Sequence, residues 1–272
     1  MKILLTGAAG HLGRAVRTLL KQDHELRLLD VKFVESRHQS VQGDVREPLD
    51  VERAAKGVDV ILHTAWLSPG SLRRKPELDF FRVNVAGTFN ALRAATRHNI
   101  PKVVVCGSLA ADDTNYAWSG AAGWTASAAE EMCRYYSLAH GIDCIFLRTG
   151  NFNRYRDYTD YGVRLLRRGV DRRDVAAAAA LAVEAEVNGF ISLAVASSHR
   201  LEPSDAEAYR ADPVATLARR YPESEGLLPD LPLPDDFLKF DLEPARRVIG
   251  YEPHYTFGTF LRGLREKQGE GA

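Results

Sequence analysis

The first thirty residues constrain the fold of this chain more than any other stretch. They read as a strand (Lys2–Thr6), a glycine-rich turn (TGAAGHLG, 6–13), a helix running to about Leu20, and a second strand (Glu25–Asp30). The glycines stand at GxxGxxG spacing, which allows a tight turn, a close approach of phosphate to the backbone, and close packing of the helix on the strand. This order of elements predicts the phosphate-binding half of a dinucleotide site.

Two features of this unit would contact the ligand. The helix start directs free N–H groups and the positive end of the helix dipole at the phosphates. Asp30 closes the second strand, where a carboxylate would accept hydrogen bonds from ribose hydroxyls and repel a 2′-phosphate, so the pattern favours NAD. The alternative is a structural glycine turn with Asp30 at the surface. The residues predicted to form this part of the site are Gly7, Gly10, His11, Leu12, Gly13 and Asp30.

Composition excludes several classes of partner. The 272 residues include 36 basic and 36 acidic side chains, so we expect no binding to nucleic acid or to an anionic membrane. No apolar stretch is long enough to span a bilayer, and the first strand begins at Lys2, so we expect no signal peptide and a cytoplasmic location. The cysteines and histidines show no metal-binding spacing, so we predict no metal, and reduced, buried thiols.

Alternating strand and helix patterns predict an α/β fold, a Rossmann-type doubly wound parallel sheet. The alternation weakens after Gly150, and half of the 12 prolines fall between His199 and Asp236. We therefore predict a nucleotide-binding domain over residues 1–150 and a smaller substrate lobe over 151–272, interleaved with the sheet. Within the lobe we expect at most a short helix near Pro213–Arg220, and Asp174 as the N-cap of a helix over Val175–Glu186.

Several motifs, in order, resemble the extended short-chain dehydrogenase/reductases, also known as NAD-dependent epimerase/dehydratases. The likeness covers nearly the whole chain. The matching stretches are TGAAGHLG (6–13), Asp44-Val45, His63-Thr64-Ala65, NVAGTFN (84–90), VVVCGS ending at Ser108, LRTGN (147–151) and FDLEPARRVIGYEP near the end. In LRTGN, Thr149 replaces the family's proline.

The resemblance implies roles for residues along the sheet edge. Ser108 would be the active-site serine, because it follows a strand end where open parallel sheets bind ligands; the alternative is a serine that starts a loop. Asn84 would contact the cofactor, or would satisfy a backbone group. Asn151 would contact the substrate together with Ser108. The remaining implied cofactor contacts are Asp44 and Val45 at the adenine, Thr64 and Ala65 beneath the cofactor, and Cys106 beside the nicotinamide.

The chain departs from the family at its catalytic pair, YxxxK. Alignment backward from RTGN gives AGWTA, so Ala122 and Ala126 stand where the family has tyrosine and lysine; the alternative register, with Trp124 and Ala128 at these places, also lacks the pair. Alanine has neither a proton to transfer nor a charge to offer. Two explanations stay open: a natural member without the pair, or a deliberately inactivated form, which the identical small side chains favour. Tyr116 is a candidate displaced base, although an aromatic cover for the site is the preferred interpretation.

The resemblance implies an NAD-dependent oxidoreductase or epimerase acting on a sugar, nucleotide sugar or sugar acid, impaired in this form. The compact lobe is similar in scale to that of family members that oxidise free sugar acids. The alternative is a non-catalytic NAD(H)-binding sensor or scaffold. Arg148 is expected to be structural, with a carboxylate or phosphate of the substrate as its alternative partner, and Arg172 and Arg173 to be a solvated pair.

Family likeness also implies a homodimer. Its interface would pair the helices Leu78–His98 and Ala126–His140 of two copies. The side chains predicted to supply apolar surface there, with core packing as the alternative for each, are Phe80, Phe81, Met132, Tyr135 and Tyr136.

Overall fold

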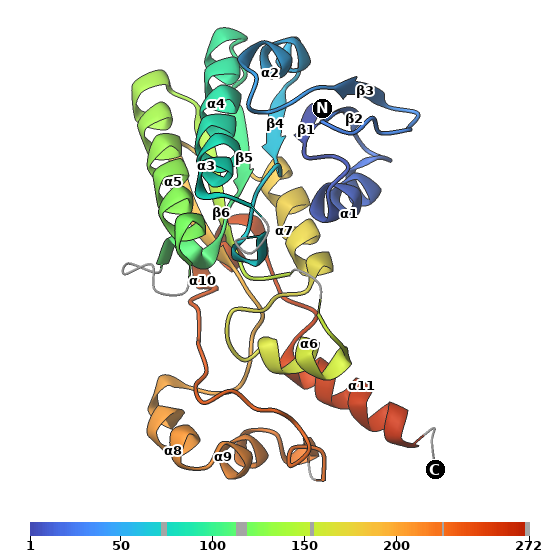
Figure 1. Ribbon diagram of the computed structural model, residues 1–272, viewed down its shortest axis with the longest axis vertical. Coiled ribbons are helices and arrows are strands. Elements are labelled where there is room, and N and C mark those ends of the chain that lie inside the picture. Colours follow the sequence, from blue (N-terminus) through green and yellow to red (C-terminus); the bar gives the residue numbers. More distant parts are fainter. Residues whose placement is uncertain (72–74, 113–118, 153–154, 225, 270–272) are drawn as a thin grey trace.

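A single parallel sheet of seven strands forms the centre of the molecule. The computed structural model describes residues 1–71, 75–112, 119–152, 155–224 and 226–269 (Figure 1). The strand order is β3-β2-β1-β4-β5-β6-β7, and every neighbouring pair is parallel, which confirms the predicted doubly wound fold. The strands are β1 (Lys2–Thr6), β2 (Glu25–Asp30), β3 (Gln39–Gln42), β4 (Val60–His63), β5 (Lys102–Cys106), β6 (Asp143–Thr149) and β7 (Phe190–Val195).

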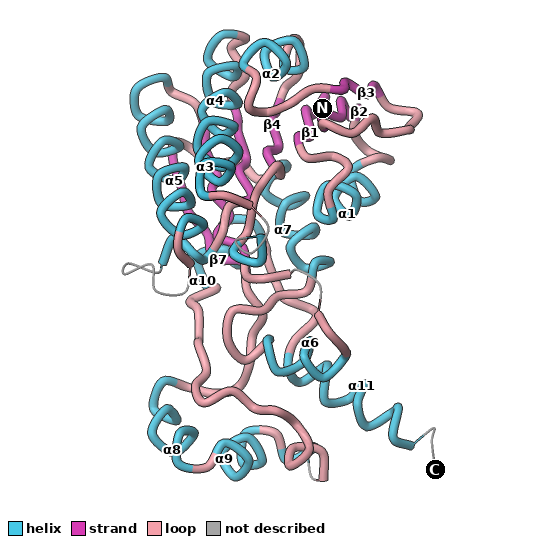
Figure 2. The backbone as a smooth tube through the Cα atoms, viewed as in Figure 1, coloured by secondary structure: helices cyan, strands magenta, loops and turns pink. Residues whose placement is uncertain are grey.

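Helices cover both faces of the sheet. Two neighbouring parallel strands need a connection that runs back from the end of one strand to the beginning of the next, and such crossovers usually contain a helix that packs on the sheet. Figure 2 shows the strands between α1 and α7 on one side and α4 and α5 on the other. Two separate apolar cores follow from this arrangement, one on each face. The covering helices are α1 (His11–Leu20), α2 (Pro48–Ala55), α4 (Gly87–Arg97), α5 (Ala121–His140), α7 (Arg172–Glu184) and α10 (Glu243–Ile249).

The helix predicted over Leu78–His98 is present but not uniform. It consists of α3 (Glu77–Phe80), a π-helical segment (Phe81–Ala86) and α4. π-Helical turns inside α-helices are rare and concentrate at functional sites. This one carries Asn84, which is completely buried.

The predicted cap of α7 was wrong. The helix begins at Arg172, and Asp171 is its N-cap, since the Asp171 side chain accepts a hydrogen bond from the backbone N–H of Arg173. Asp174 lies inside the first turn and accepts the backbone N–H groups of His254 and Tyr255, both at 3.0 Å. Either of two aspartates three residues apart can cap a helix. Here Asp174 instead accepts hydrogen bonds from a segment that is distant in the sequence, and Asp171 is the cap.

A small lobe lies beyond the carboxyl end of the sheet (Figure 1). It contains α6 (Tyr158–Arg164), α8 (Ala206–Ala211), α9 (Pro213–Arg220) and α11 (Phe257–Gly269) around its own apolar cluster. The expectation of one short helix between the prolines was wrong in extent, because α8 precedes α9. Since α7 and β7 return to the sheet, the division at residue 150 stays a proposal. No helix within the described ranges has the length and apolarity needed to cross a membrane.

Candidate active site

A cavity of about 590 Å³ opens at the carboxyl ends of the strands. Open parallel sheets bind their ligands at this edge. Most of the predicted site residues line it, although they are spread over the first 151 residues of the chain. These are Gly7, Gly10, His11, Leu12, Asp30, Asp44, Val45, Thr64, Ala65, Cys106, Ser108 and Asn151.

The glycine turn fits a pyrophosphate. Gly7 has φ +68°, and a Cβ there would lie 2.7 Å from the backbone nitrogen of Ala65. A Cβ on Gly13 would lie 2.2 Å from the carbonyl oxygen of Gly7, so Gly13 lets α1 pack on the turn and does not line the cavity. The N-cap residue Gly10 makes no side-chain hydrogen bond, and the first turn of α1 holds no acidic residue. Gly10, His11 and Leu12 at this helix start line the cavity, and the unpaired N–H groups and the dipole of a helix start favour an anion there.

Asp30 is held in position by two backbone donors. Its carboxylate accepts the N–H of Ala9 at 2.9 Å and the N–H of Lys32 at 3.0 Å. The two bonds occupy one lone pair on each oxygen, and the residue lines the cavity. The remaining lone pairs suit a ribose diol, and the charge disfavours a 2′-phosphate.

The predicted adenine contacts lie at the same end. The Asp44 carboxylate accepts hydrogen bonds from the Arg46 side chain (Nε, 2.8 Å) and backbone (2.9 Å). Burial works to raise the pKa of Asp44, but these hydrogen bonds and the Arg46 charge outweigh it and hold that pKa below its usual value. Val45 packs closely on Gly87, since a Cβ atom added to Gly87 would lie 3.0 Å from Cγ2 of Val45. This end of the cavity therefore combines a fixed charge at Asp44 with an apolar surface at Val45.

Ser108 stands at the opposite end of the cavity. Its Oγ accepts the backbone N–H of Ala110 at 3.1 Å, which leaves the hydroxyl proton for another acceptor. Before it, Gly107 has no room for a side chain, since a Cβ would lie 2.1 Å from the Phe146 ring. The Cys106 thiol lines the same end, and burial raises its pKa to about 12, so it stays protonated at neutral pH.

Besides Gly13, three predicted site residues do not line the cavity. Asn84 is fully buried; its side chain accepts the N–H of Leu67 at 2.8 Å and donates to the carbonyl of Leu67 at 2.9 Å and to Thr125 at 3.1 Å. The structure thus gives Asn84 the backbone-satisfying role that the sequence left as its alternative. Ala122 and Ala126 have no exposed surface and do not line the cavity.

The cavity also contains residues that sequence reasoning missed. Trp66 and Leu67 follow directly after the His63-Thr64-Ala65 strand end, and that position was the available signal. Arg168 carries no local signal, because it reaches the site through a pairing of the lobe with the end of β6. There, the N–H of Asn151 donates to the carbonyl of Arg168 at 2.5 Å. The others are backbone neighbours of predicted residues or belong to the segment after β4.

A second cavity of about 310 Å³ continues into the lobe and shares Asn151 and Arg168 with the first. Arg164 and Arg167 also line it, and its described lining includes no carboxylate. Arg164 pairs with Asp160 at 2.9 Å, and Arg167 pairs with Asp236 at 2.7 Å.

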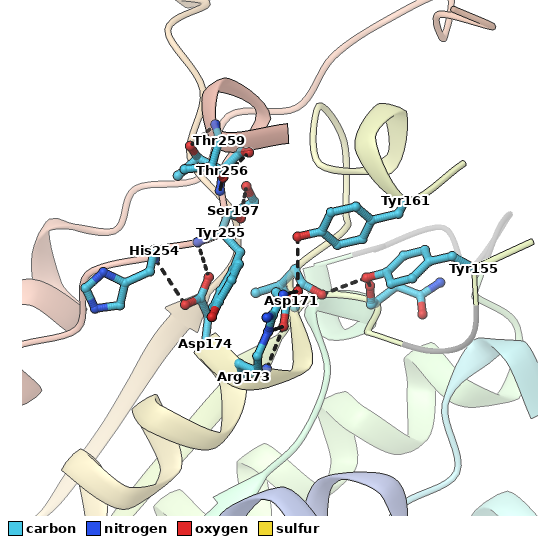
Figure 3. A network of polar contacts seen from close by, with 12 residues as sticks. Tyr155, Tyr161, Asp171, Arg173, Asp174, Ser197, His254, Tyr255, Thr256 and Thr259 are labelled. Carbon is cyan, nitrogen blue, oxygen red and sulfur yellow. Dashed lines mark hydrogen bonds and ion pairs between the residues drawn. The ribbon is translucent and has the colours of Figure 1, made fainter. Parts of the chain in front are cut away.

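Other polar residues named from the sequence hold the scaffold together. Arg148 forms two hydrogen bonds with the buried Glu130 carboxylate, at 2.8 and 2.7 Å, which agrees with its expected structural role. Arg173 is not merely solvated: Figure 3 shows it against Asp171, and its guanidinium lies 3.4 Å from the centre of the Tyr255 ring. Tyr161 donates to the same Asp171 at 3.0 Å. Tyr116 lies outside the described residues.

No cluster of three or more His, Cys, Asp or Glu side chains suited to a metal ion is found among the residues that the structure describes. The fixed turn, the aspartate and the serine fit a nicotinamide dinucleotide instead. These residues would hold its pyrophosphate, its adenosine ribose and the region of its nicotinamide, in that order.

Two curated proteins resemble this chain in sequence. The uronate dehydrogenase of Pseudomonas syringae pv. tomato is 32% identical over 166 residues, which are 55% of this chain and 59% of that protein. The sterol demethylase protein B of Methylococcus capsulatus is 30% identical over 146 residues, 50% of this chain and 43% of that protein. The matches therefore span less than two thirds of these curated relatives.

Solved structures share the fold. A uronate dehydrogenase from Agrobacterium tumefaciens superposes with a TM-score of 0.70 at 21% identity, covering 97% of this chain and 88% of that one. A mutant of that enzyme complexed with NAD gives a TM-score of 0.69 at 22% identity, covering 97% and 89%. Residues 3–166, more than half of the chain, match the family model. The chain thus belongs to the NAD dependent epimerase/dehydratase family.

Proposed function

We propose that this protein binds NAD in the large cavity and belongs functionally to the oxidoreductases and epimerases that act on sugar acids or nucleotide sugars. One observation carries the proposal. A single cavity joins the glycine turn and Asp30 at one end to Ser108 and Asn151 at the other. A dinucleotide laid along it would place its nicotinamide beside a hydroxyl that can orient a substrate oxygen.

NAD would supply the hydride acceptor or donor. The chain's own contribution is positioning: Ser108 retains a hydroxyl proton for a substrate oxygen, and Asn151 lines the same cavity. The protonated Cys106 adds no charge at this end. The site is therefore built to hold a polyhydroxylated substrate against a flat ring.

A free sugar acid suits the remaining space better than a nucleotide sugar. The dinucleotide fills much of the larger cavity, and the second cavity of about 310 Å³ has room for a monosaccharide. Arg168, which lines both cavities, would favour an anionic group such as a carboxylate, whereas Arg164 and Arg167 are already paired with Asp160 and Asp236. The named activity of the Pseudomonas relative, uronate dehydrogenase, agrees with this choice.

Turnover should be impaired, because no tyrosine or lysine extends from Ala122 or Ala126. Loss of a positioned acid or base lowers a rate by roughly 100- to 10,000-fold. The test is to titrate the protein with NAD in a calorimeter and then to follow NADH formation with galacturonate, glucuronate and UDP-glucose. We expect binding, slow oxidation of the acids only, and loss of that oxidation in Ser108→Ala at unchanged NAD affinity. Binding of neither NAD nor NADH would refute the proposal.

The complete burial of both alanines also supports a second candidate, a cofactor-dependent sensor or scaffold that does not turn over. It predicts that NADH changes the affinity for a partner protein while no substrate is oxidised. A partner captured equally well with and without NADH would remove its support.

We further propose a homodimer through α4 and α5. Tyr135 and Leu138 are 62% and 82% exposed, and Phe81 stacks on the exposed Trp124 at 6.2 Å. Two of the predicted interface residues are instead core residues, because Phe80 is fully buried and Tyr136 is 9% exposed. The remaining apolar side chains still form a surface on one face of the helix pair.

A further inference from the structure

Leu67 lies between the large cavity and the start of α5, and Trp66 precedes it in the chain. Trp66 and Leu67, which follow β4, both line the cavity. On the other side, Leu67 packs on the buried cluster of Phe80, Ala121 and Ala122. The Trp66 ring stands edge-on to Phe146, with centroids 6.3 Å apart. These two side chains, Trp66 and Leu67, are termed the apolar wall below.

The backbone of the apolar wall is tied down. The Asn84 amide accepts from the N–H of Leu67 and donates to its carbonyl, so both backbone groups of Leu67 are used. Asn84 also donates to Thr125, whose hydroxyl donates to the carbonyl of Ala121 at 2.5 Å. The wall is therefore fixed to the π-helical segment and to α5 at the same point.

The two alanines are completely buried. Ala122 and Ala126 have no exposed surface and line neither cavity. Truncating large side chains in a packed interior normally leaves a cavity, because the surroundings relax only in part. Here the neighbouring side chains are large where those of α5 are small.

The Trp66 indole adds a second observation. Its N–H is buried and has no hydrogen-bond partner among the described residues. Because this nitrogen has no accessible surface, the part of Trp66 that lines the cavity does not include the N–H group.

We propose that the apolar wall forms the nicotinamide end of the cofactor site, so that a bound cofactor meets the Trp66 indole instead of polar side chains from α5. The inference rests on the proposed NAD binding. It makes Trp66 a binding residue and Leu67 the side chain that closes α5 off from the cavity.

Tryptophan emission tests the first part. An oxidised nicotinamide ring quenches indole fluorescence on contact, and the chain has 3 tryptophans. We expect NAD to quench the wild-type emission. At NAD concentrations that calorimetry shows to be saturating for each variant, Trp66→Phe should lose most of that quenching, and the matched control Trp124→Phe, at an exposed position, should retain it. Undiminished quenching in Trp66→Phe overturns the inference, whereas absence of NAD heat in the wild type overturns the proposed function itself.

A pair of substitutions tests the second part without any cofactor. Ala122→Tyr should lower the unfolding midpoint strongly when Leu67 is present and much less in a Leu67→Ala background, because the shorter side chain makes room. If the tyrosine variants do not fold, Ala122→Leu makes the same comparison with a smaller volume. Losses that simply add in the double variant contradict the proposed wall.

Discussion

Two glycines with the same backbone conformation allow a controlled test of the phosphate turn. Gly7 has φ +68° and Gly57 has φ +71°, so alanine is strained at both positions by about 1–2 kcal/mol. A Cβ at Gly57 would meet no atom within 4 Å. At Gly7 it would lie 2.7 Å from the Ala65 nitrogen and 2.9 Å from the Thr64 carbonyl carbon, both backbone atoms that cannot rotate away.

The extra crowding sets the difference between the two variants. Overpacking typically costs about 1–3 kcal/mol, so Gly7→Ala should lose that much more stability than Gly57→Ala. For a chain of this size the additional loss lowers the melting temperature by roughly 2–4 °C per kcal/mol. NAD affinity should fall in Gly7→Ala, because the turn must move, and stay unchanged in Gly57→Ala. Thermal unfolding and calorimetric titration measure both effects. Equal stability losses and equal NAD affinities in the two variants would refute the reasoning.

Further predictions concern the ribose contact, a buried histidine and the helix surface. Asp30→Asn should weaken NAD binding by about tenfold and reduce discrimination against NADP, as measured by calorimetry with each nucleotide; unchanged discrimination would contradict the assigned contact. Burial lowers the pKa of His63 from 6.5 to about 4, so the unfolded chain binds a proton between these pH values that the folded chain does not. The free energy of unfolding should therefore fall as pH drops through this window, by about 3 kcal/mol at most. His63→Gln should flatten this pH dependence, as measured by urea unfolding. An identical pH dependence in the variant would exclude His63 as its source. Tyr135→Glu with Leu138→Glu should convert a dimer to a monomer in light scattering, and a wild-type monomer would rule the interface out.

The sheet was predictable because its signals are local. Each buried strand is a short apolar run, and the glycine turn specifies the first crossover by itself. The end of α7 that faces the lobe was predicted wrongly, because the choice between Asp171 and Asp174 as its cap depends on where residues 254 and 255 pack. Such a contact spans about eighty residues and leaves no trace in local spacing.

The cavity divides in the same way. The glycine turn is one continuous stretch, and its predicted residues line the cavity, apart from Gly13, which packs beneath the turn. At the opposite end the sequence indicated Ser108 and Asn151 but not Trp66 or Arg168. Spacing identifies residues that follow strand ends, whereas it says little about which large side chain fills a gap left by small ones across the interior.

Calorimetric titration of the wild-type protein with NAD and with NADH tests the central claim most directly. The account predicts saturable heat from one site per chain, lost or strongly reduced in Gly7→Ala and retained in Gly57→Ala. Absence of heat with both nucleotides, in a protein shown to be folded, would contradict it.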